Sequence, residues 1–378
     1  MKILVVAGEA SGDQHAAGVV REIRRRVPEA RFFGMGGRRL EAEGVDLLYR
    51  VEEISVMGLT EVLPKLRRIL RVMDGLARAA ARRRPDCALL VDVPDFNLRL
   101  ARTLKRMGVK VAYYVGPTIW AWRPGRVHQV GARVDRMLCI LPFEVPFYRR
   151  AGVQAQYVGN PVVEQVPPPA PVHVLRQAFG LRPEAPALAL LPGSRMSEIR
   201  RIAPTMAKAA AALRARRPEL QLLVPVAPGL PEAALRAAFS GVPGGVTLVA
   251  GRAPEVVGAC DAAVVASGTA VLEAGLMERP LVVVYRVAPL TGLLARVLLR
   301  VRHVSLINLL AGREVVPELL QGDLTAGRVV AEVERLLSSP EARERMLAGL
   351  REVRSALGGP GASARAAAAV LELCGAPT

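Results

Sequence analysis

The chain has 378 residues, a formal net charge of +18, and 51% hydrophobic against 23% charged residues. This length suits two domains better than one core, and the composition excludes a disordered chain. No apolar run approaches the length that spans a bilayer. So strong a positive field attracts nucleic acid, anionic lipid or phosphorylated substrates. The alternative is that the arginine-rich composition reflects coding bias.

The four cysteines, at positions 87, 139, 260 and 374, lie far apart and show no CxxC spacing. We therefore expect neither a zinc site nor a disulfide framework, and a reducing cytoplasm fits this pattern best. The first residues, MKILVVAGEASGD, lack the long apolar stretch and cleavage site of a secretory signal. They predict a first β-strand.

Short apolar runs alternate with longer amphipathic segments, a pattern typical of βα units around a parallel sheet. In the first half the predicted strands are 2–7, 31–34, 87–92, 110–115, 137–141 and 156–158, with helices at about 14–26, 60–83, 97–107 and 145–151. A second series of strands is predicted at 187–191, 221–225, 246–249, 262–266 and 281–285.

We accordingly expect an α/β protein of two doubly wound, Rossmann-like domains facing across a cleft. The Pro-rich residues 166–172 are the predicted linker between domains 1–165 and 173–340. The helices of 341–378 pack back on the first domain or on a second subunit. Sheets of this kind bind ligands at the carboxyl ends of their strands, so the motifs there are the candidates for chemistry.

The motif GEASGD follows the first predicted strand and precedes a helix. Its glycines permit tight backbone geometry, Ser11 and Asp13 are suited to cap the helix, and exposed N–H groups at a helix start favour anions. Glu9 helps neither a strand nor a cap, which favours a role in binding. The motif is either a substrate loop, with Glu9, Ser11, Gly12 and Asp13 as its candidates, or a well-capped turn.

The motif DVPDFN, residues 92–97, places two carboxylates where a strand ends. A substrate hydroxyl at the mouth of the sheet is within reach of such groups. Asp95 is predicted to be a general base, with capping of the next helix as the alternative. For Asp92, capping is the leading prediction.

The segment GPTIWAWRPGR, residues 116–126, contains both tryptophans of the chain, next to Arg123 and Arg126. The indole rings either wall a sugar pocket, anchor the protein at a lipid interface, or pack in the core. The sequence leaves these alternatives open.

The motif LPGSRMSE, residues 191–198, repeats the order of strand, glycine turn and helix in the second domain. Arg195 adds a planar fork that matches a diphosphate. The spacing is neither that of a P-loop nor G-x-G-x-x-G, which disfavours ATP and NAD. The predicted phosphate-binding residues are Gly193, Ser194, Arg195 and Glu198.

The motif ASGTAVLEAG, residues 266–275, follows another strand of the second domain. Ser267, Gly268 and Thr269 are small enough for a nucleotide to approach the backbone. Glu273 lies one helical turn after Thr269 on the same face, where its carboxylate is placed to accept both hydroxyls of a ribose. Further along, Asn308 lies in an apolar run and is either a satisfied core amide or a substrate contact.

Taken together and in order, these motifs resemble the lipid-A-disaccharide synthase family, glycosyltransferase family 19 with the GT-B fold. The similarity rests on GEASGD, VMGLTEVLPKL, DVPDFN, WAWRPGRV, LPGSR, ASGTAVLEAG and VSLINLLAGRE, spread over residues 8–314. The resemblance implies an inverting enzyme that joins UDP-2,3-diacylglucosamine to 2,3-diacylglucosamine 1-phosphate (lipid X) through a β-1,6 bond, releasing UDP. It implies no cofactor and no metal.

The same resemblance implies roles for individual residues. Asp95 would deprotonate the acceptor 6-hydroxyl, Arg195 and Asn308 would be associated with activity, and GEASGD would lie near the acceptor or the diphosphate. His15 is a rival base, because a histidine that faces the cleft titrates near neutrality.

The acylated substrates also suggest a purpose for LPKLRRILRVM, residues 63–73, in which apolar side chains recur at helical spacing among basic ones. It is either an ordinary surface helix or a lipid-facing one, with Leu66, Arg67, Ile69 and Leu70 toward the membrane. The second alternative predicts a peripheral protein on inner-membrane phospholipid, at the cytoplasmic face in a Gram-negative-type bacterium. A homodimer is one option for its assembly.

Two other functions compete with this interpretation. A muramyl-type N-acetylglucosaminyltransferase or a UDP-sugar 2-epimerase would share the UDP-binding domain, but DVPDFN and NLLAGRE argue against both. A nucleic-acid-binding protein would cluster its basic residues among aromatic ones, whereas aromatic residues are only 4% here. No nucleic-acid partner is therefore expected.

Overall fold

The computed structural model describes residues 1–53, 62–122, 124–167, 170–288 and 301–375, with the side chains of 62–65 left out. Most of VMGLTEVLPKL, Arg123 and part of the Pro-rich linker therefore lie outside the described residues. The chain divides into two compact units. Unit 1 comprises Met1–Pro161 with Gly359–Thr378, and unit 2 comprises Val162–Gly358.

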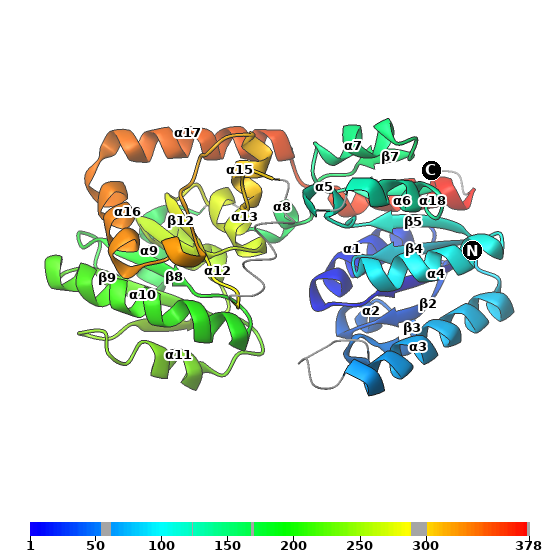
Figure 1. The fold of residues 1–378 in the computed structure, drawn as a ribbon, viewed down its shortest axis with the longest axis horizontal. Coiled ribbons are helices and arrows are strands. Elements are labelled where there is room, and N and C mark those ends of the chain that lie inside the picture. The colour runs from blue at the N-terminus through cyan, green and yellow to red at the C-terminus, as the bar shows by residue number, and fades with distance from the viewer. Residues whose placement is uncertain (54–61, 123, 168–169, 289–300, 376–378) are drawn as a thin grey trace. The chain divides into compact units, whose positions relative to one another are not determined.

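Unit 1 is built on a seven-stranded parallel sheet in the order β3-β2-β1-β4-β5-β6-β7 (Figure 1). Its strands are β1 (Lys2–Ala7), β2 (Arg31–Gly36), β3 (Asp46–Arg50), β4 (Cys87–Val91), β5 (Lys110–Tyr114), β6 (Arg136–Cys139) and β7 (Ala155–Tyr157). Its helices are α1 (Ala10–Arg26), α2 (Arg38–Ala42), α3 (Val62–Arg83), α4 (Pro94–Arg106), α5 (Ile119–Trp122), α6 (Val127–Gly131), α7 (Glu144–Arg150) and α18 (Ala362–Cys374).

Unit 2 repeats this plan with a six-stranded parallel sheet in the order β10-β9-β8-β11-β12-β13. Its strands are β8 (Ala187–Leu191), β9 (Gln221–Val226), β10 (Thr247–Ala250), β11 (Ala262–Ala266), β12 (Leu281–Tyr285) and β13 (Glu318–Leu320). Its helices are α8 (Val162–Gln165), α9 (Val172–Ala178), α10 (Met196–Arg216), α11 (Glu232–Ala238), α12 (Ala253–Ala259), α13 (Thr269–Leu276), α15 (Leu306–Ala311), α16 (Ala326–Ser338) and α17 (Pro340–Leu357).

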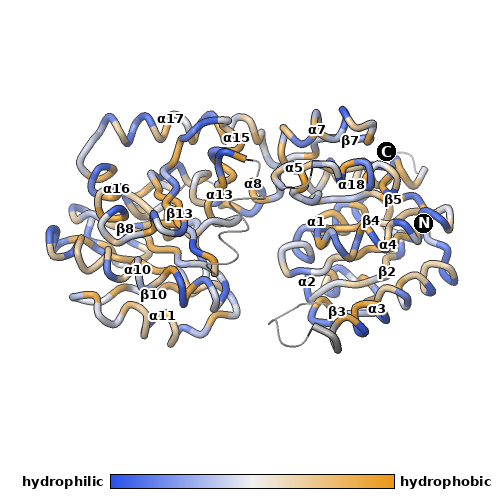
Figure 2. Tube along the Cα trace, in the orientation of Figure 1, coloured by the Kyte–Doolittle hydropathy of each residue, from blue (hydrophilic) through white to orange (hydrophobic). Residues whose placement is uncertain are grey.

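The central strands of each sheet are buried on both faces, which explains why they read as continuous apolar runs. In β1, Leu4 and Val6 pack in one core cluster, with residues of α3 and α4, whereas Ile3 and Val5 pack in another, with residues of α1 and α18. The hydropathy colouring accordingly follows the strands inside each unit, while α3 alternates between apolar and polar positions (Figure 2). The predicted doubly wound α/β class is confirmed in both units.

Several short elements were not predicted, among them α2, α5, α6, β3 and β13. β3 is only half-buried at the edge of its sheet, and β13 is three residues long. Neither has the continuous apolar run that marks a buried strand, because an edge strand is covered less completely. The other strands fall within one or two residues of their expected bounds.

The two C-terminal helices belong to different units. α17 lies in unit 2, whereas α18 returns to unit 1 and packs on α1, as the red helix of Figure 1. Its buried residues include Ala366, Val370 and Leu371. Arginines of unit 1 hold its backbone, since Arg26 donates to the Ala364 carbonyl and Arg136 to the Ala369 carbonyl.

The expectation that no disulfide is present is wrong for one pair. Cys87, the first residue of β4, is bonded to Cys374, the last residue of α18, with a Cα–Cα distance of 5.5 Å. The two cysteines are 287 residues apart in sequence. Their spacing in the sequence does not indicate that they pair, because only the return of α18 to unit 1 brings them together. Cys139 and Cys260 are buried free thiols, and burial raises the pKa of each.

We predict that Leu371→Ala destabilises unit 1 by about 2–5 kcal/mol, because it leaves a cavity between α18 and the sheet. Chemical denaturation followed by circular dichroism measures this loss. Glu372→Ala is the matched control on the exposed side of the same helix, where the ion pair with Arg136 contributes at most about 1 kcal/mol. Equal stability of Leu371→Ala and wild type would contradict the packing of α18 on unit 1.

Candidate functional site

In unit 1 the motifs GEASGD and DVPDFN meet at adjacent strand ends. β1 and β4 are neighbours in register from Ile3↔Cys87 to Ala7↔Val91, and the chain leaves them on either side of the point where strand order reverses. A Cβ placed on Gly12 would lie 3.7 Å from the Cβ of Asp92. The structure thus brings GEASGD and DVPDFN together at the topological switch point, the usual ligand position in such sheets.

The turn after β4 has an unusual backbone. Asp92 and Val93 have φ of 57° and 43°, a left-handed conformation that costs a β-branched residue such as valine of order 1–3 kcal/mol. Two fully buried side chains hold the turn: the Asn97 amide donates to the carbonyls of Val91 (3.0 Å) and Asp92 (2.8 Å), and the Tyr113 hydroxyl donates to that of Asp92 (2.6 Å).

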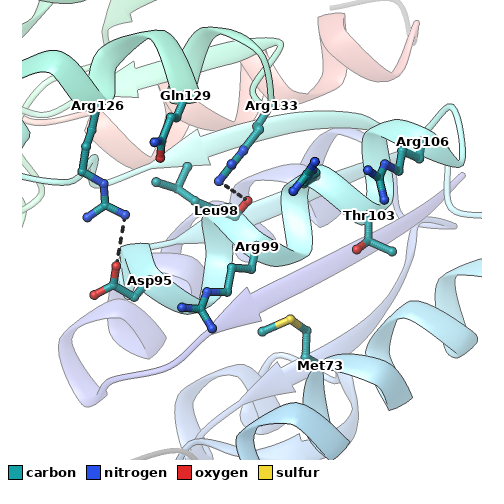
Figure 3. Close-up of a pocket in the computed structure, with 10 residues that line it drawn as sticks. Met73, Asp95, Leu98, Arg99, Thr103, Arg106, Arg126, Gln129 and Arg133 are labelled. Carbon is teal, nitrogen blue, oxygen red and sulfur yellow. Dashed lines mark hydrogen bonds and ion pairs between the residues drawn. The ribbon is translucent and has the colours of Figure 1, made fainter.

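Asp92 and Asp95 have different surroundings. Burial raises the pKa of the Asp92 carboxyl, a hydrogen bond from the Val93 N–H opposes this rise, and the charge of Glu9 adds to it. Asp95 lies in the first turn of α4 with 78% of its side chain exposed, and it pairs with Arg126 at 3.1 Å (Figure 3). Neither residue caps α4, since Val93 is at the N-cap position and no side chain bonds there. The capping alternative is therefore wrong for both.

Asp95 also opens onto a pocket of about 510 Å³. Five arginines line it, Arg99, Arg102, Arg106, Arg126 and Arg133, together with Met73, Leu98, Thr103 and Gln129 (Figure 3). The sequence analysis missed this pocket. The signal that was available is the spacing of three arginines along the predicted helix after DVPDFN.

GEASGD forms the start of α1 differently from expectation. The helix begins at Ala10, so Ser11 and Asp13 lie inside its first turn, and their predicted capping of this helix is wrong. The buried Asp13 carboxylate instead caps α2, accepting bonds from the N–H groups of Gly37 (2.6 Å) and Arg39 (3.0 Å). Glu9 and Ser11 are exposed, so they are the members of this loop whose side chains face solvent.

The rival base and one tryptophan have packing partners in unit 1. His15 is half-buried with its ring 6.4 Å from that of Tyr114. The Trp120 indole donates to the buried Glu144 carboxylate at 3.2 Å and packs edge-on against Phe143. Burial raises the pKa of Glu144 to about 7, although bonds from the Leu141 N–H, Trp120 and the Ile140 N–H oppose this shift. Trp120 thus contributes to the packing of unit 1.

In unit 2 the motif LPGSRMSE makes a tight turn between β8 and α10. Gly193 has φ of 123°, and a Cβ there would lie 2.6 Å from the Cβ of Glu198, so the turn requires glycine. The Glu198 carboxylate accepts bonds from the N–H groups of Ser194 (2.8 Å) and Arg195 (3.2 Å). Two of the N–H groups predicted for a phosphate are thus satisfied by Glu198, whereas the Arg195 side chain is 68% exposed.

The second motif of unit 2 follows β11, which pairs with β8 in register. Both motifs therefore lie at the switch point of this sheet, as in unit 1. Ser267 is half-exposed, Gly268 and Thr269 are exposed, and α13 begins at Thr269. Burial raises the pKa of Glu273, which forms no hydrogen bond or ion pair with other described residues. A desolvated carboxylate without a partner is typical of a binding site.

Asn308 is fully buried in unit 2, and both ends of its amide are engaged. Its Nδ2 donates to the Val316 carbonyl and to Glu318, each at 2.8 Å, while its Oδ1 accepts from the N–H groups of Val315 (2.7 Å) and Val316 (3.0 Å). These contacts are those of a satisfied core amide. A link between Asn308 and activity stays a prediction, and its contacts are those of a positioning residue.

The segment predicted to face lipid lies on α3. Leu66 and Leu70 are 43% and 47% exposed, one helical turn apart, and Arg67 is exposed as well. Ile69 instead packs against the core of unit 1. No described helix is both long and apolar enough to cross a bilayer. Within the described ranges, no three His, Cys, Asp or Glu side chains are grouped so that they would hold a metal ion.

Comparisons with known proteins give the same family over nearly the whole chain. A family model described as lipid-A-disaccharide synthetase matches residues 3–371. The chain is 62% identical to the lipid-A-disaccharide synthase of Myxococcus xanthus, covering 98% of this chain and 97% of that one. It is 55% identical to that of Anaeromyxobacter dehalogenans strain 2CP-1, with the same coverage.

Solved structures show the fold at much lower identity. A putative UDP-N-acetylglucosamine 2-epimerase from Listeria monocytogenes has a TM-score of 0.67 at 15% identity, covering 98% of this chain and 96% of its own. The calicheamicin glycosyltransferase CalG4 has a TM-score of 0.59 at 18% identity, covering 99% and 98%. Acinetobacter baumannii MurG has 0.59 at 12%, covering 98% and 99%. The chain has the GT-B fold that these glycosyltransferases share.

We predict that Asn97→Ala destabilises unit 1 by about 1–3 kcal/mol, since two buried carbonyls lose a donor. Asn97→Asp, which has nearly the same shape, should destabilise at least as much, because a carboxylate would face those carbonyls. Thermal unfolding measures both changes. Wild-type stability in Asn97→Asp would show that the amide does not hold the turn.

Proposed function

The chain belongs to the lipid-A-disaccharide synthetase family, and on that premise we propose that it joins UDP-2,3-diacylglucosamine to 2,3-diacylglucosamine 1-phosphate by a β-1,6 bond, with inversion and release of UDP. The match to the family over residues 3–371 carries this proposal. We assign the acceptor to unit 1 and the UDP group to unit 2. No metal or cofactor is part of the proposed reaction.

Asp95 is the proposed base. Its exposed carboxylate is available to take the proton of the acceptor 6-hydroxyl as that oxygen attacks the anomeric carbon, and Arg126 orients it through their ion pair. Asp92 is less suited, because its side chain is half-buried, whereas that of Asp95 is exposed. His15, half-buried beside Tyr114, remains the rival base.

Arg195 is the proposed partner of the departing diphosphate. Charge develops on the leaving UDP as the sugar passes through an oxocarbenium-like transition state, and a guanidinium fork stabilises that charge. At the start of α10, the Arg195 side chain pairs with Glu198 at 3.3 Å and is 68% exposed, so it is open to a diphosphate. The carboxylate of Glu273, which bonds to no other residue that the structure describes, is the proposed acceptor of the ribose hydroxyls, with Ser267, Gly268 and Thr269 beside the nucleotide.

The acyl chains of both substrates give the exposed face of α3 a role in this proposal. Leu66 and Leu70 would contact the apolar surface of a bilayer, and the neighbouring Arg67 would contact anionic headgroups. The protein would then work as a peripheral protein at the cytoplasmic face of the inner membrane.

We predict that Asp95→Asn lowers turnover at least about 100-fold, because the amide has no basic oxygen for the proton. UDP affinity, measured by calorimetry, should stay within about twofold of wild type. Arg195→Ala is the contrasting variant and should weaken UDP binding. Near-normal turnover of Asp95→Asn would remove Asp95 from this role and favour His15.

Mass spectrometry of the disaccharide product measures the turnover of these variants. The same assay tests the proposed reaction of the wild-type protein. Wild type with both acylated substrates should give a disaccharide 1-phosphate. Formation of disaccharide at a comparable rate from acceptors without acyl chains would contradict the lipid substrate.

We predict that Glu273 makes UDP binding depend on pH. Its ionised carboxylate accepts both ribose hydroxyls, so affinity should fall as pH decreases through its raised pKa and the group becomes protonated. Calorimetry should show about tenfold weaker binding by Glu273→Gln at pH 8, and a smaller difference between variant and wild type at pH 5.

At each pH the UDP affinity of Glu273→Gln is divided by that of wild type. Titration of the UDP phosphate affects both affinities equally and therefore cancels in this ratio. Glu232→Gln, an exposed glutamate of the same unit, is the control and should behave like wild type. A pH-independent ratio for Glu273→Gln would exclude ionisation of Glu273 as a factor in binding.

A further inference from the structure

One face of α4 carries the proposed base and three arginines in a line. Asp95, Arg99, Arg102 and Arg106 are spaced i, i+4, i+7 and i+11, the spacing that places side chains on the same side of a helix. All four line the pocket of about 510 Å³ described above. Figure 3 shows Arg99, Thr103 and Arg106 along this helix, among the residues that line the pocket.

A second wall of the pocket comes from the segment that contains α6. Arg126 and Arg133 reach from it toward α4, with Gln129 between them (Figure 3). Arg133 donates to the Leu98 carbonyl of α4 at 3.4 Å. The pocket is thus bounded by two segments of unit 1 that contact each other.

The positive charge in this pocket is not neutralised by the protein residues described. Asp95 is the one carboxylate among the lining residues, and it pairs with Arg126. Arg99, Arg102 and Arg106 have no ion-pair partner in the described ranges of the chain. Burial lowers the pKa of Arg133, and repulsion from Arg102 and Arg126 lowers it further.

Arg99, Arg102 and Arg106 are exposed to solvent, and with Arg126 and Arg133 they form one positively charged lining that is open to an anion. Arg99, Arg102 and Arg106 form no hydrogen bond or ion pair with other residues in the described ranges. Guanidinium groups bind phosphate oxygens through paired, charge-assisted hydrogen bonds. A multiply charged phosphate monoester neutralises several of these groups at once.

We propose that this arginine pocket is the subsite for the 1-phosphate of the acceptor sugar. The inference rests on the proposed function, because it takes Asp95 as the group that meets the acceptor hydroxyl. Arg99 and Arg102 lie about 6 Å and about 10 Å along the helix axis from Asp95. A sugar whose 6-hydroxyl meets Asp95 therefore directs a phosphate at the other end of its ring toward these two arginines. They select a phosphorylated acceptor over its dephosphorylated form.

The test compares two acceptors in two proteins. For wild type, removal of the phosphate from 2,3-diacylglucosamine 1-phosphate should raise the acceptor KM at least about tenfold. In Arg99→Ala with Arg102→Ala, the KM for the phosphorylated acceptor should rise by a similar factor, and removal of the phosphate should then have little further effect. Arg99→Lys with Arg102→Lys keeps the charge without the fork and should restore part of the preference.

The control double variant is Arg25→Ala with Arg82→Ala, which removes the same charge from exposed positions of unit 1 outside the pocket. It should keep the wild-type preference for phosphate. An equal loss of preference in the control would overturn the proposal. An equal phosphate effect in wild type and in the Arg99, Arg102 variant would overturn it too, while disaccharide formation would leave the proposed function standing.

Two binding measurements separate this inference from its alternatives. Glucosamine 1-phosphate and glucosamine, titrated into wild type and the variants by NMR, report on the subsite even if no disaccharide forms; equal affinity for both sugars would overturn the proposal. Flotation with phosphatidylglycerol vesicles reports on a lipid headgroup as the source of the phosphate. If the Arg99, Arg102 variant lost vesicle binding and kept its acceptor preference, the arginines would be assigned to the membrane surface instead.

Discussion

The buried amide of Asn97 is the contact on which the geometry of unit 1 depends. It gives both of its N–H groups to the carbonyls of Val91 and Asp92, where the chain passes through two left-handed residues. Without a buried donor on the inside of that turn, the backbone would relax toward ordinary strand geometry. This turn also determines where α4 begins. It therefore determines which way Asp95 points, and which way the arginines that follow it on the same face point.

Unit 2 solves the same problem with different residues. Its turn after β8 uses a glycine at φ of 123° and a glutamate one helical turn later that accepts from two N–H groups of the turn. In unit 1 the turn has two residues larger than glycine in a strained conformation, and its carbonyls accept the hydrogen bonds. In unit 2 the turn has a glycine at this position, and its N–H groups donate the hydrogen bonds. In both units, a side chain of the following helix hydrogen-bonds to the backbone of this turn. The turn lies at the switch point of the sheet, where ligands bind in this fold.

The sequence predicted correctly those elements whose signal lies in neighbouring residues. Continuous apolar runs predicted the buried strands, and glycine-containing turns after β1, β8 and β11 predicted which strand ends carry the motifs. It failed where the partner of a residue is distant along the chain. Asp13 looked like a cap for its own helix and caps α2, because only the pairing of β1 with β2 reveals the second helix. The bond between Cys87 and Cys374 was missed for the same reason.

The return of α18 to unit 1 also constrains how the protein is made. A ribosome delivers β1–β7 first, but α18, which covers α1 and completes that core, is translated only after the whole of unit 2. Unit 2 has all of its own residues before α18 is synthesised, so it is able to fold while unit 1 still exposes apolar surface. Unit 1 therefore begins to be translated first but completes its folding last. A chain that stopped after unit 2 would therefore carry a complete unit 2 and a unit 1 that lacks α18 and exposes part of its core.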